Sequence, residues 1–125
     1  MPFKVRNVTK DKLLADRADE ARSFVRRLVG LMGRRELPFG EGLHIVPCNS
    51  IHTFFMKIPI DALFLDRSHK VVKVLEALAP WRATAIYFSA HSVLELPSGT
   101  VIASGTSEGD QLELTQSLTG ESRVA

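Results

Sequence analysis

A chain of 125 residues has the size of one ordinary domain, and its 45% hydrophobic and 24% charged residues are typical of a globular protein. One cysteine excludes an internal disulfide, and no apolar run approaches the ~18 residues that would span a bilayer. The N-terminal residues lack the continuous apolar region of a signal peptide. We therefore expect a single domain over residues 1–125 that is soluble, cytoplasmic and free of membrane contact.

Charge is distributed unevenly along the chain. Residues 1–35 contain ten Lys or Arg and four Asp or Glu. Residues 36–125 contain six Lys or Arg and ten Asp or Glu. The basic part is dense enough to attract phosphates or an acidic partner, through Arg22, Arg26, Arg27, Arg34 and Arg35. A solvated helix face explains the same pattern, and a net charge of +2 does not favour nucleic acid.

The first half of the chain predicts two strands and one helix. Residues 3–8 and 13–18 are predicted to be strands joined by a polar turn. A helix follows, capped by Ser23 and carrying one apolar stripe made of Phe24, Val25, Leu28, Val29 and Met32. A short apolar run then covers residues 43–46.

The second half predicts short strands separated by turns. Residues 61–66 and 71–78 form a predicted hairpin, and residues 100–104 a short helical turn. Further strands are predicted at residues 51–56, 84–89, 92–96 and 111–114. This pattern favours the α+β class, as a predominantly β compact single domain with a curled sheet or partial barrel, one main helix and a short helical turn. The polar tail, residues 117–125, is expected to fray.

Reactive side chains gather in residues 47–66, which contain the only cysteine. Cys48 and His52 could form a nucleophilic dyad across a loop, with Asn49 or Asp61 orienting the ring. A lone cysteine more often behaves as a small apolar residue, so we expect Cys48 to have a packed or hydrogen-bonding role. By the same reasoning, His52 and Thr53 would satisfy backbone groups at a strand end.

A zinc site is a further possibility, because His44, Cys48 and His52 are spaced by four residues and have side chains that bind zinc. The proline before Cys48 interrupts the strand that would point all three to one face. The fourth ligand would have to come from His91 or Asp61. We expect no metal and no cofactor.

Two carboxylates interrupt apolar runs, where an unpaired charge would be costly to bury. Asp61 and Glu95 therefore each need a positive or hydrogen-bond-donating partner. Arg27 and Arg34 are candidates, because a guanidinium can bind a carboxylate through two hydrogen bonds.

The remaining large side chains of the central segment suit a core or a pocket wall. A methionine such as Met56 fills irregular gaps and makes favourable contacts with aromatic rings, and Phe54 and Phe55 would provide such rings. Trp81 is expected to pack a loop against the sheet.

Five segments in order carry a resemblance to a known family: RLVGLMGR at 27–34, PCNSIHTFFM at 47–56, IDALFLD at 60–66, VLELPSG at 93–99 and GD at 109–110. They are similar to the motifs of the bacterial and archaeal family catalogued as domain of unknown function 192. The resemblance covers about residues 8–114. It implies a compact, predominantly β fold with a small helical component, and no particular activity.

These observations together predict a small binding or interaction module with a polar site near residues 47–61 and Glu95. Its partner would be a small ligand or a protein. Thiol- or carboxylate-assisted enzyme chemistry at the same site is the first alternative, and binding of nucleic acid or an acidic partner to the basic face is the second. The candidate pocket residues are Arg27, Arg34, Cys48, Asn49, His52, Thr53, Met56, Asp61 and Glu95.

Overall fold

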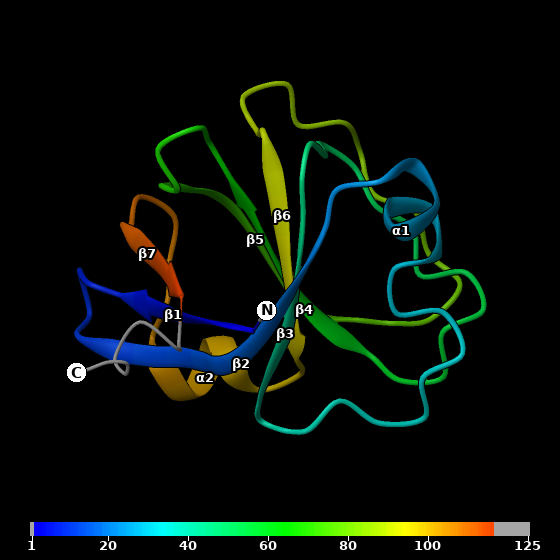
Figure 1. Ribbon diagram of the computed structural model, residues 1–125, viewed down its shortest axis with the longest axis horizontal. Coiled ribbons are helices and arrows are strands. Elements are labelled where there is room, and N and C mark those ends of the chain that lie inside the picture. The colour runs from blue at the N-terminus through cyan, green and yellow to red at the C-terminus, as the bar shows by residue number, and fades with distance from the viewer. Residues whose placement is uncertain (1, 117–125) are drawn as a thin grey trace.

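The computed structural model describes residues 2–116, which form one curled seven-stranded sheet with two short helices (Figure 1). The elements are β1 Phe3–Asn7, β2 Lys12–Ala21, α1 Phe24–Val29, β3 Gly40–Ile45, β4 Ile60–Leu65, β5 Val71–Leu78, β6 Ser92–Pro97, α2 Thr100–Ser104 and β7 Leu112–Gln116. The predicted class, predominantly β with a curled sheet, is confirmed. The tail predicted to fray, residues 117–125, lies outside the described residues.

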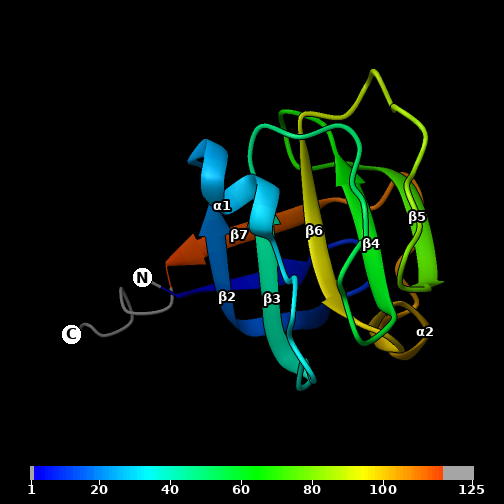
Figure 2. The same cartoon turned by 90° about the vertical axis from the view of Figure 1, so that its right-hand side faces the viewer.

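The strand order is β5-β4-β6-β3-β2-β1-β7, and of its neighbouring pairs only β2 and β3 run parallel. Figure 2 shows β1 and β7 crossing behind β3 and β6, so the sheet curls into half a barrel. The two edge strands approach each other at one end. There Lys70 and Gln111 form a bridge, and the Val71 nitrogen donates to the Asp110 oxygen at 2.9 Å.

The central strands β4 and β6 are buried along their whole length. Their alternate residues face two different apolar clusters, because side chains on a strand point to opposite faces. The inner face of the curl holds Leu63, Leu65, Leu94 and Leu96. The outer face holds Ile60, Ala62, Phe64 and Val93. Burial on both faces explains why these segments are continuous apolar runs in the sequence.

The strands predicted at residues 51–56 and 84–89 are wrong. Both segments are loops that cover the outer face of β4 and β6, and one isolated bridge, His52 to Ala83, joins this region. Their apolar and β-branched composition reflects packing, since Ile51 and Tyr87 lie against the Phe64 cluster. The predicted hairpin of β4 and β5 and the helical turn α2 are confirmed.

Helix α1 begins where the sequence predicts, because the Ser23 Oγ accepts the Arg26 backbone N–H at 3.0 Å. Its predicted apolar stripe is wrong at Val25 and Val29, which are 65% and 44% exposed. The side chains of the other stripe positions on the helix, Phe24 and Leu28, lie outside what the structure describes. Neither helix within residues 2–116 is long and apolar enough to cross a membrane.

Candidate binding pocket

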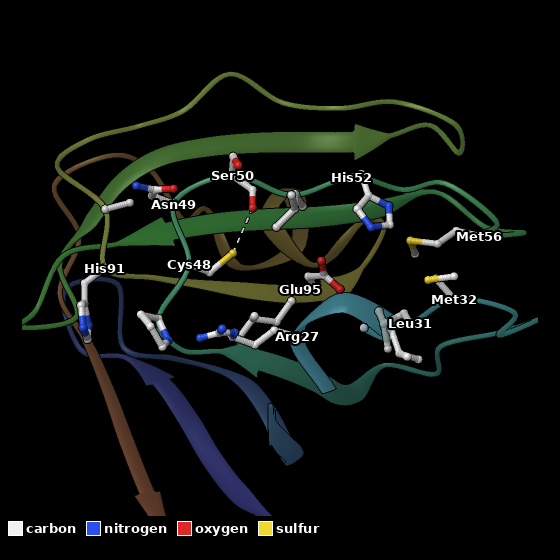
Figure 3. A pocket seen from close by; sticks show the side chains of 16 residues that line it. Arg27, Leu31, Met32, Cys48, Asn49, Ser50, His52, Met56, His91 and Glu95 are labelled. Atoms are coloured by element: carbon white, nitrogen blue, oxygen red, sulfur yellow. Dashed lines mark hydrogen bonds between the residues drawn. The ribbon is translucent and has the colours of Figure 1, made fainter. Parts of the chain in front are cut away.

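A cavity of about 580 Å³ lies on the outer face of the sheet, between α1, the segment that follows β3, and β6 (Figure 3). We call it the Glu95 pocket. Its apolar lining includes Leu31, Met32, Ile45, Ile51 and Met56, and its polar lining includes Arg27, Asn49, His52, His91 and Glu95. This volume lies in the range of cavities that hold small ligands.

Glu95 lies on the floor of the pocket and is only 2% exposed. It pairs with Leu43 of β3 and Ala62 of β4, so its side chain points to the outer face of the sheet between two apolar neighbours. Its Oε1 has no hydrogen-bond partner among residues 2–116. Burial raises the pKa of the Glu95 carboxyl to about 8, so the group carries a proton at neutral pH.

Gly30 provides the space in front of this carboxyl. It ends α1 with φ 51° and ψ −125°, a conformation that disfavours residues with a side chain. A Cβ atom at this position would lie 3.9 Å from the Glu95 Oε1. The helix end therefore passes close to the acid without contributing a side chain to cover it.

Cys48 lines the pocket as a thiol. Its Sγ donates to the Ser50 carbonyl oxygen at 3.0 Å, and its backbone N–H donates to the His91 oxygen at 2.8 Å. Burial raises the pKa of the Cys48 thiol above its ordinary value. Since the thiolate is the nucleophilic form, these surroundings do not activate the sulfur.

His52 lies at the boundary between the pocket and an exposed aromatic cluster. Its Nδ1 accepts the Phe54 N–H at 3.2 Å, which leaves Nε2 to carry the ring proton. The prediction that Phe54 and Phe55 belong to a core or a pocket wall is wrong, because they are 39% and 58% exposed and do not line the Glu95 pocket. Trp81 does not pack against the sheet as expected: its ring lies 4.7 Å from that of Phe55, and the residue is 56% exposed.

Asp61 lies outside the pocket lining, on the inner face of the sheet beside α2. Its Oδ1 accepts the Ala77 N–H at 2.8 Å, and its Oδ2 accepts the N–H groups of Gly99 at 3.2 Å and Val101 at 2.9 Å. The prediction of a positive or hydrogen-bond-donating partner is confirmed for Asp61. The donors are backbone N–H groups at the β5 irregularity and the start of α2, and not the candidate arginines.

Thr53 and Arg34 also lie away from the pocket. The buried Thr53 Oγ1 donates to the Ala79 oxygen at 2.6 Å and accepts the Arg82 N–H at 2.9 Å, so it ties two loops together. Arg34 pairs with Glu41 at 2.9 Å on the surface. The prediction of a positive or hydrogen-bond-donating partner is wrong for Glu95, because no ion pair to it forms within residues 2–116 and its Oε1 accepts no hydrogen bond there.

The three residues with metal-ligand spacing separate in space. His44 points to the inner face of the sheet, where its ring meets those of Phe3 and His69. Burial lowers the pKa of His44 to about 4. Cys48 and His52 remain on the outer side, in the Glu95 pocket. No three His, Cys, Asp or Glu side chains among residues 2–116 are placed to hold one ion.

Part of the positive charge in the basic N-terminal part of the chain is neutralised by ion pairs with neighbouring carboxylates. Arg22 pairs with Glu20, and Arg17 pairs with Asp16 at 2.7 Å. Arg27 contributes to the pocket rather than to an open surface.

Four further residues line the pocket that the sequence does not indicate as pocket residues: Gly30, Leu31, Met32 and His91. The first three belong to one of the five motifs, but nothing local indicates that the end of α1 turns over β6. His91 directly precedes β6, and its position follows only from the path of the loop before that strand.

The fold and the pocket together define a small β-rich domain, a half-barrel that encloses a mixed polar and apolar cavity on its outer face. The chain belongs to the DUF192 family, described as "Uncharacterized ACR", whose family model matches residues 5–114. The resemblance found in the sequence is thereby confirmed.

The relatives agree with this assignment. A UPF0127 protein of Pyrococcus furiosus is 34% identical over 112 residues, covering 86% of this chain and 94% of its own. A crystal structure of a Novosphingobium aromaticivorans protein of unknown function superposes with a TM-score of 0.78 at 24% identity, over 90% of this chain and 84% of that one. A crystal structure from Sinorhizobium meliloti, provisionally described as a transcription regulator, superposes with a TM-score of 0.76 at 25% identity. The match covers 90% of this chain and 91% of that one.

Proposed function

We propose that this protein is a small-molecule-binding module whose ligand occupies the Glu95 pocket. The observation that carries the proposal is a carboxyl group 2% exposed, facing a cavity of about 580 Å³, with no partner for its Oε1 among residues 2–116. An unsatisfied buried polar group destabilises a fold, so its presence favours a role in recognition.

The composition of the lining supports binding of a small ligand. Ligand pockets combine mostly apolar walls with a few polar groups that orient the bound molecule. Here the apolar walls come from the end of α1, the turn after it, β3 and the segment that follows β3. The polar groups are at Arg27, Asn49, His52 and Glu95.

Binding is favoured over thiol catalysis because of the state of Cys48. A nucleophilic cysteine requires surroundings that stabilise the thiolate, and here burial raises the pKa of Cys48 and favours the protonated thiol. The alternative of carboxylate-assisted enzyme chemistry rests on Glu95 alone, whose carboxyl could donate a proton to a bound molecule.

The two pocket methionines offer a direct test. The chain has three methionines, and ¹³C-methyl labelling would give one signal for each, assigned through Met32→Leu and Met56→Leu. In a screen of small polar and apolar fragments, we expect ligands to shift the Met32 and Met56 signals together. The same spectra, followed over time, would reveal any conversion of the fragment and so identify an enzyme.

Arg34→Gln is the matched control, because Arg34 pairs with Glu41 outside the pocket. Its response to fragments should equal that of the unmodified protein. If no fragment shifts either pocket methionine, the binding proposal is wrong.

A further inference from the structure

The Glu95 pocket presents three different chemistries along its length (Figure 3). In this view the Glu95 carboxyl lies between the Arg27 guanidinium on one side and the sulfur atoms of Met32 and Met56 on the other. A cationic group, an acid and an apolar end thus follow one another. This order restricts the ligands that would satisfy all three.

Both polar groups lack a partner within the described part of the chain. Oε1 of Glu95 accepts no hydrogen bond within residues 2–116, and the Arg27 guanidinium takes part in no hydrogen bond or ion pair there. The contrast with Arg34 is informative, since that arginine lies seven residues further along and is paired. A guanidinium and an acid that can ionise, both unpaired in one cavity, suit a ligand that carries an anionic group for the first and a cationic group for the second.

We propose that the pocket binds an apolar α-amino acid or a close derivative, with its ammonium at Glu95, its carboxylate at Arg27, and its side chain at Leu31, Met32 and Met56. This inference rests on the proposed binding function and specifies the class of ligand.

An ammonium group suits the position of Glu95. It supplies up to three N–H donors and a positive charge, and a desolvated carboxylate needs both. Gly30 leaves the Oε1 side open, because its missing Cβ would lie only 3.9 Å from that oxygen. The Gly30 N–H does not fill this role, since it donates to the Arg26 oxygen.

A carboxylate next to the ammonium explains the presence of Arg27. A simple alkylamine would place a second positive charge near the guanidinium without compensation. An α-carboxylate instead accepts two parallel hydrogen bonds from a guanidinium and neutralises it. Asn49 lines the same pocket and provides an additional polar contact.

The apolar end suits side chains of varied shape. Leu31 and Met56 are 6% and 4% exposed, so this wall is shielded from bulk solvent. Methionine side chains adapt to different apolar shapes, which favours leucine, methionine and phenylalanine as a group over one of them.

Proton release would accompany binding. Burial raises the pKa of Glu95 to about 8, so the free protein must lose this proton when an ammonium binds. The other ionisable groups that line the pocket are Arg27, Cys48, His52 and His91, while the paired residues on β3 and β4 are apolar. Affinity is expected to rise about tenfold per pH unit from pH 5.5 to 7.5 and to level off above pH 8.

Calorimetric titration with L-leucine, L-methionine and L-phenylalanine provides the test. Two analogues of leucine serve as matched ligands: 4-methylpentanoate lacks the amine and 3-methylbutylamine lacks the carboxylate. We expect each analogue to bind at least about tenfold more weakly than leucine. Buffers of different ionisation enthalpy should reveal about one proton released per leucine at pH 7.

Variants assign each effect to its residue. Glu95→Gln should abolish both the proton release and the rise of affinity with pH, although it retains His52 and His91. Arg27→Gln should bind leucine and 3-methylbutylamine with equal affinity. Arg34→Gln should behave as the unmodified protein.

The outcomes separate this inference from the proposed function. If fragments shift the pocket methionines but no amino acid binds at millimolar concentration, or 4-methylpentanoate binds as tightly as leucine, the amino-acid assignment is wrong and the binding function stands. If neither fragments nor amino acids affect these methionines, both are wrong.

Discussion

Asp61 and Glu95 are buried carboxyl groups on neighbouring strands, and their surroundings differ completely. Asp61 faces the inner side of the sheet and accepts three backbone N–H groups at 2.8 to 3.2 Å. Glu95 faces the outer side, where its Oε1 has no partner among residues 2–116. Both are at most 2% exposed. The same fold therefore contains a carboxylate that organises the backbone and an acid that is left open to a cavity.

This difference shows which of the two groups stabilises the protein. The Asp61 carboxylate connects β4 to β5 and to the start of α2, so its loss would leave several buried donors without an acceptor. Among residues 2–116, no hydrogen bond to the Glu95 Oε1 is lost when this residue is replaced. Substitutions at the two positions should therefore have opposite effects on stability.

The largest effect is expected for Asp61→Leu. Removing the acceptor of three N–H groups should lower the free energy of unfolding by about 3–5 kcal/mol, as each unsatisfied buried group costs about 1–3 kcal/mol. Asp61→Asn, which keeps one acceptor oxygen, should lose less. Urea denaturation measures both. A loss below about 1 kcal/mol for the leucine variant would show that the backbone finds other acceptors.

Glu95→Gln should stabilise the protein at neutral pH. The carboxyl has a pKa of about 8 in the folded state and an ordinary pKa of 4.5 in the unfolded chain, so folding at pH 7 requires it to take up a proton. The stability associated with this proton is complete below pH 4.5 and is lost as the pH rises through 8. At pH 7 the glutamine variant should gain about 2–3 kcal/mol over the unmodified protein.

At pH 4 the two proteins should be equally stable. Urea denaturation of both at several pH values between 4 and 8 therefore checks the sign as well as the size of the effect. Parallel pH profiles would mean that Glu95 is ionised in the folded protein and has a partner. From the sequence alone, replacement of Glu95 would be expected to leave a positive or hydrogen-bond-donating partner unsatisfied. The structure reverses this expectation, because no arginine pairs with Glu95 within residues 2–116.

The fold was predictable from the sequence where a local pattern of residues matches an element of secondary structure. The runs at β4 and β6 are apolar because they are buried on both faces, and Ser23 marks the start of α1 correctly. Residues 51–56 were mistaken for a strand because β-branched and aromatic residues indicate packing as well as pairing. Local composition cannot distinguish a strand from a loop that covers a sheet.

The location of the polar site was predictable only in part. Cys48, Asn49, His52 and Met56 are close in sequence, and the fold places all of them with Glu95 in one pocket. The partners of the carboxylates could not be predicted, because they depend on which sheet face each strand residue occupies. A change of one residue, from Ala62 to Asp61 on β4, moves a side chain from the outer to the inner face.

A smaller effect is expected at Cys48. Cys48→Ser should fold and should lose no more than about 1 kcal/mol, because a hydroxyl can also donate to the Ser50 oxygen. Since burial raises the pKa of the thiol, iodoacetamide should modify the native protein more slowly than the urea-unfolded chain at pH 7. Faster modification of the native protein, with loss of a demonstrated activity in Cys48→Ser, would favour the thiol-enzyme alternative.

The smallest effect is expected from zinc, whose removal should leave the protein unchanged. The four-residue spacing of His44, Cys48 and His52 would suit a metal only on a continuous strand, and the chain places His44 on the opposite face of the sheet from the other two. Elemental analysis after dialysis against a chelator should find far less than one zinc per chain, and the melting temperature should not move. One zinc per chain that is lost in His52→Ala, but retained in His44→Ala, would instead indicate a metal bound within the Glu95 pocket. Comparing these two variants is decisive because the sheet separates the two histidines, so a single ion cannot depend on both.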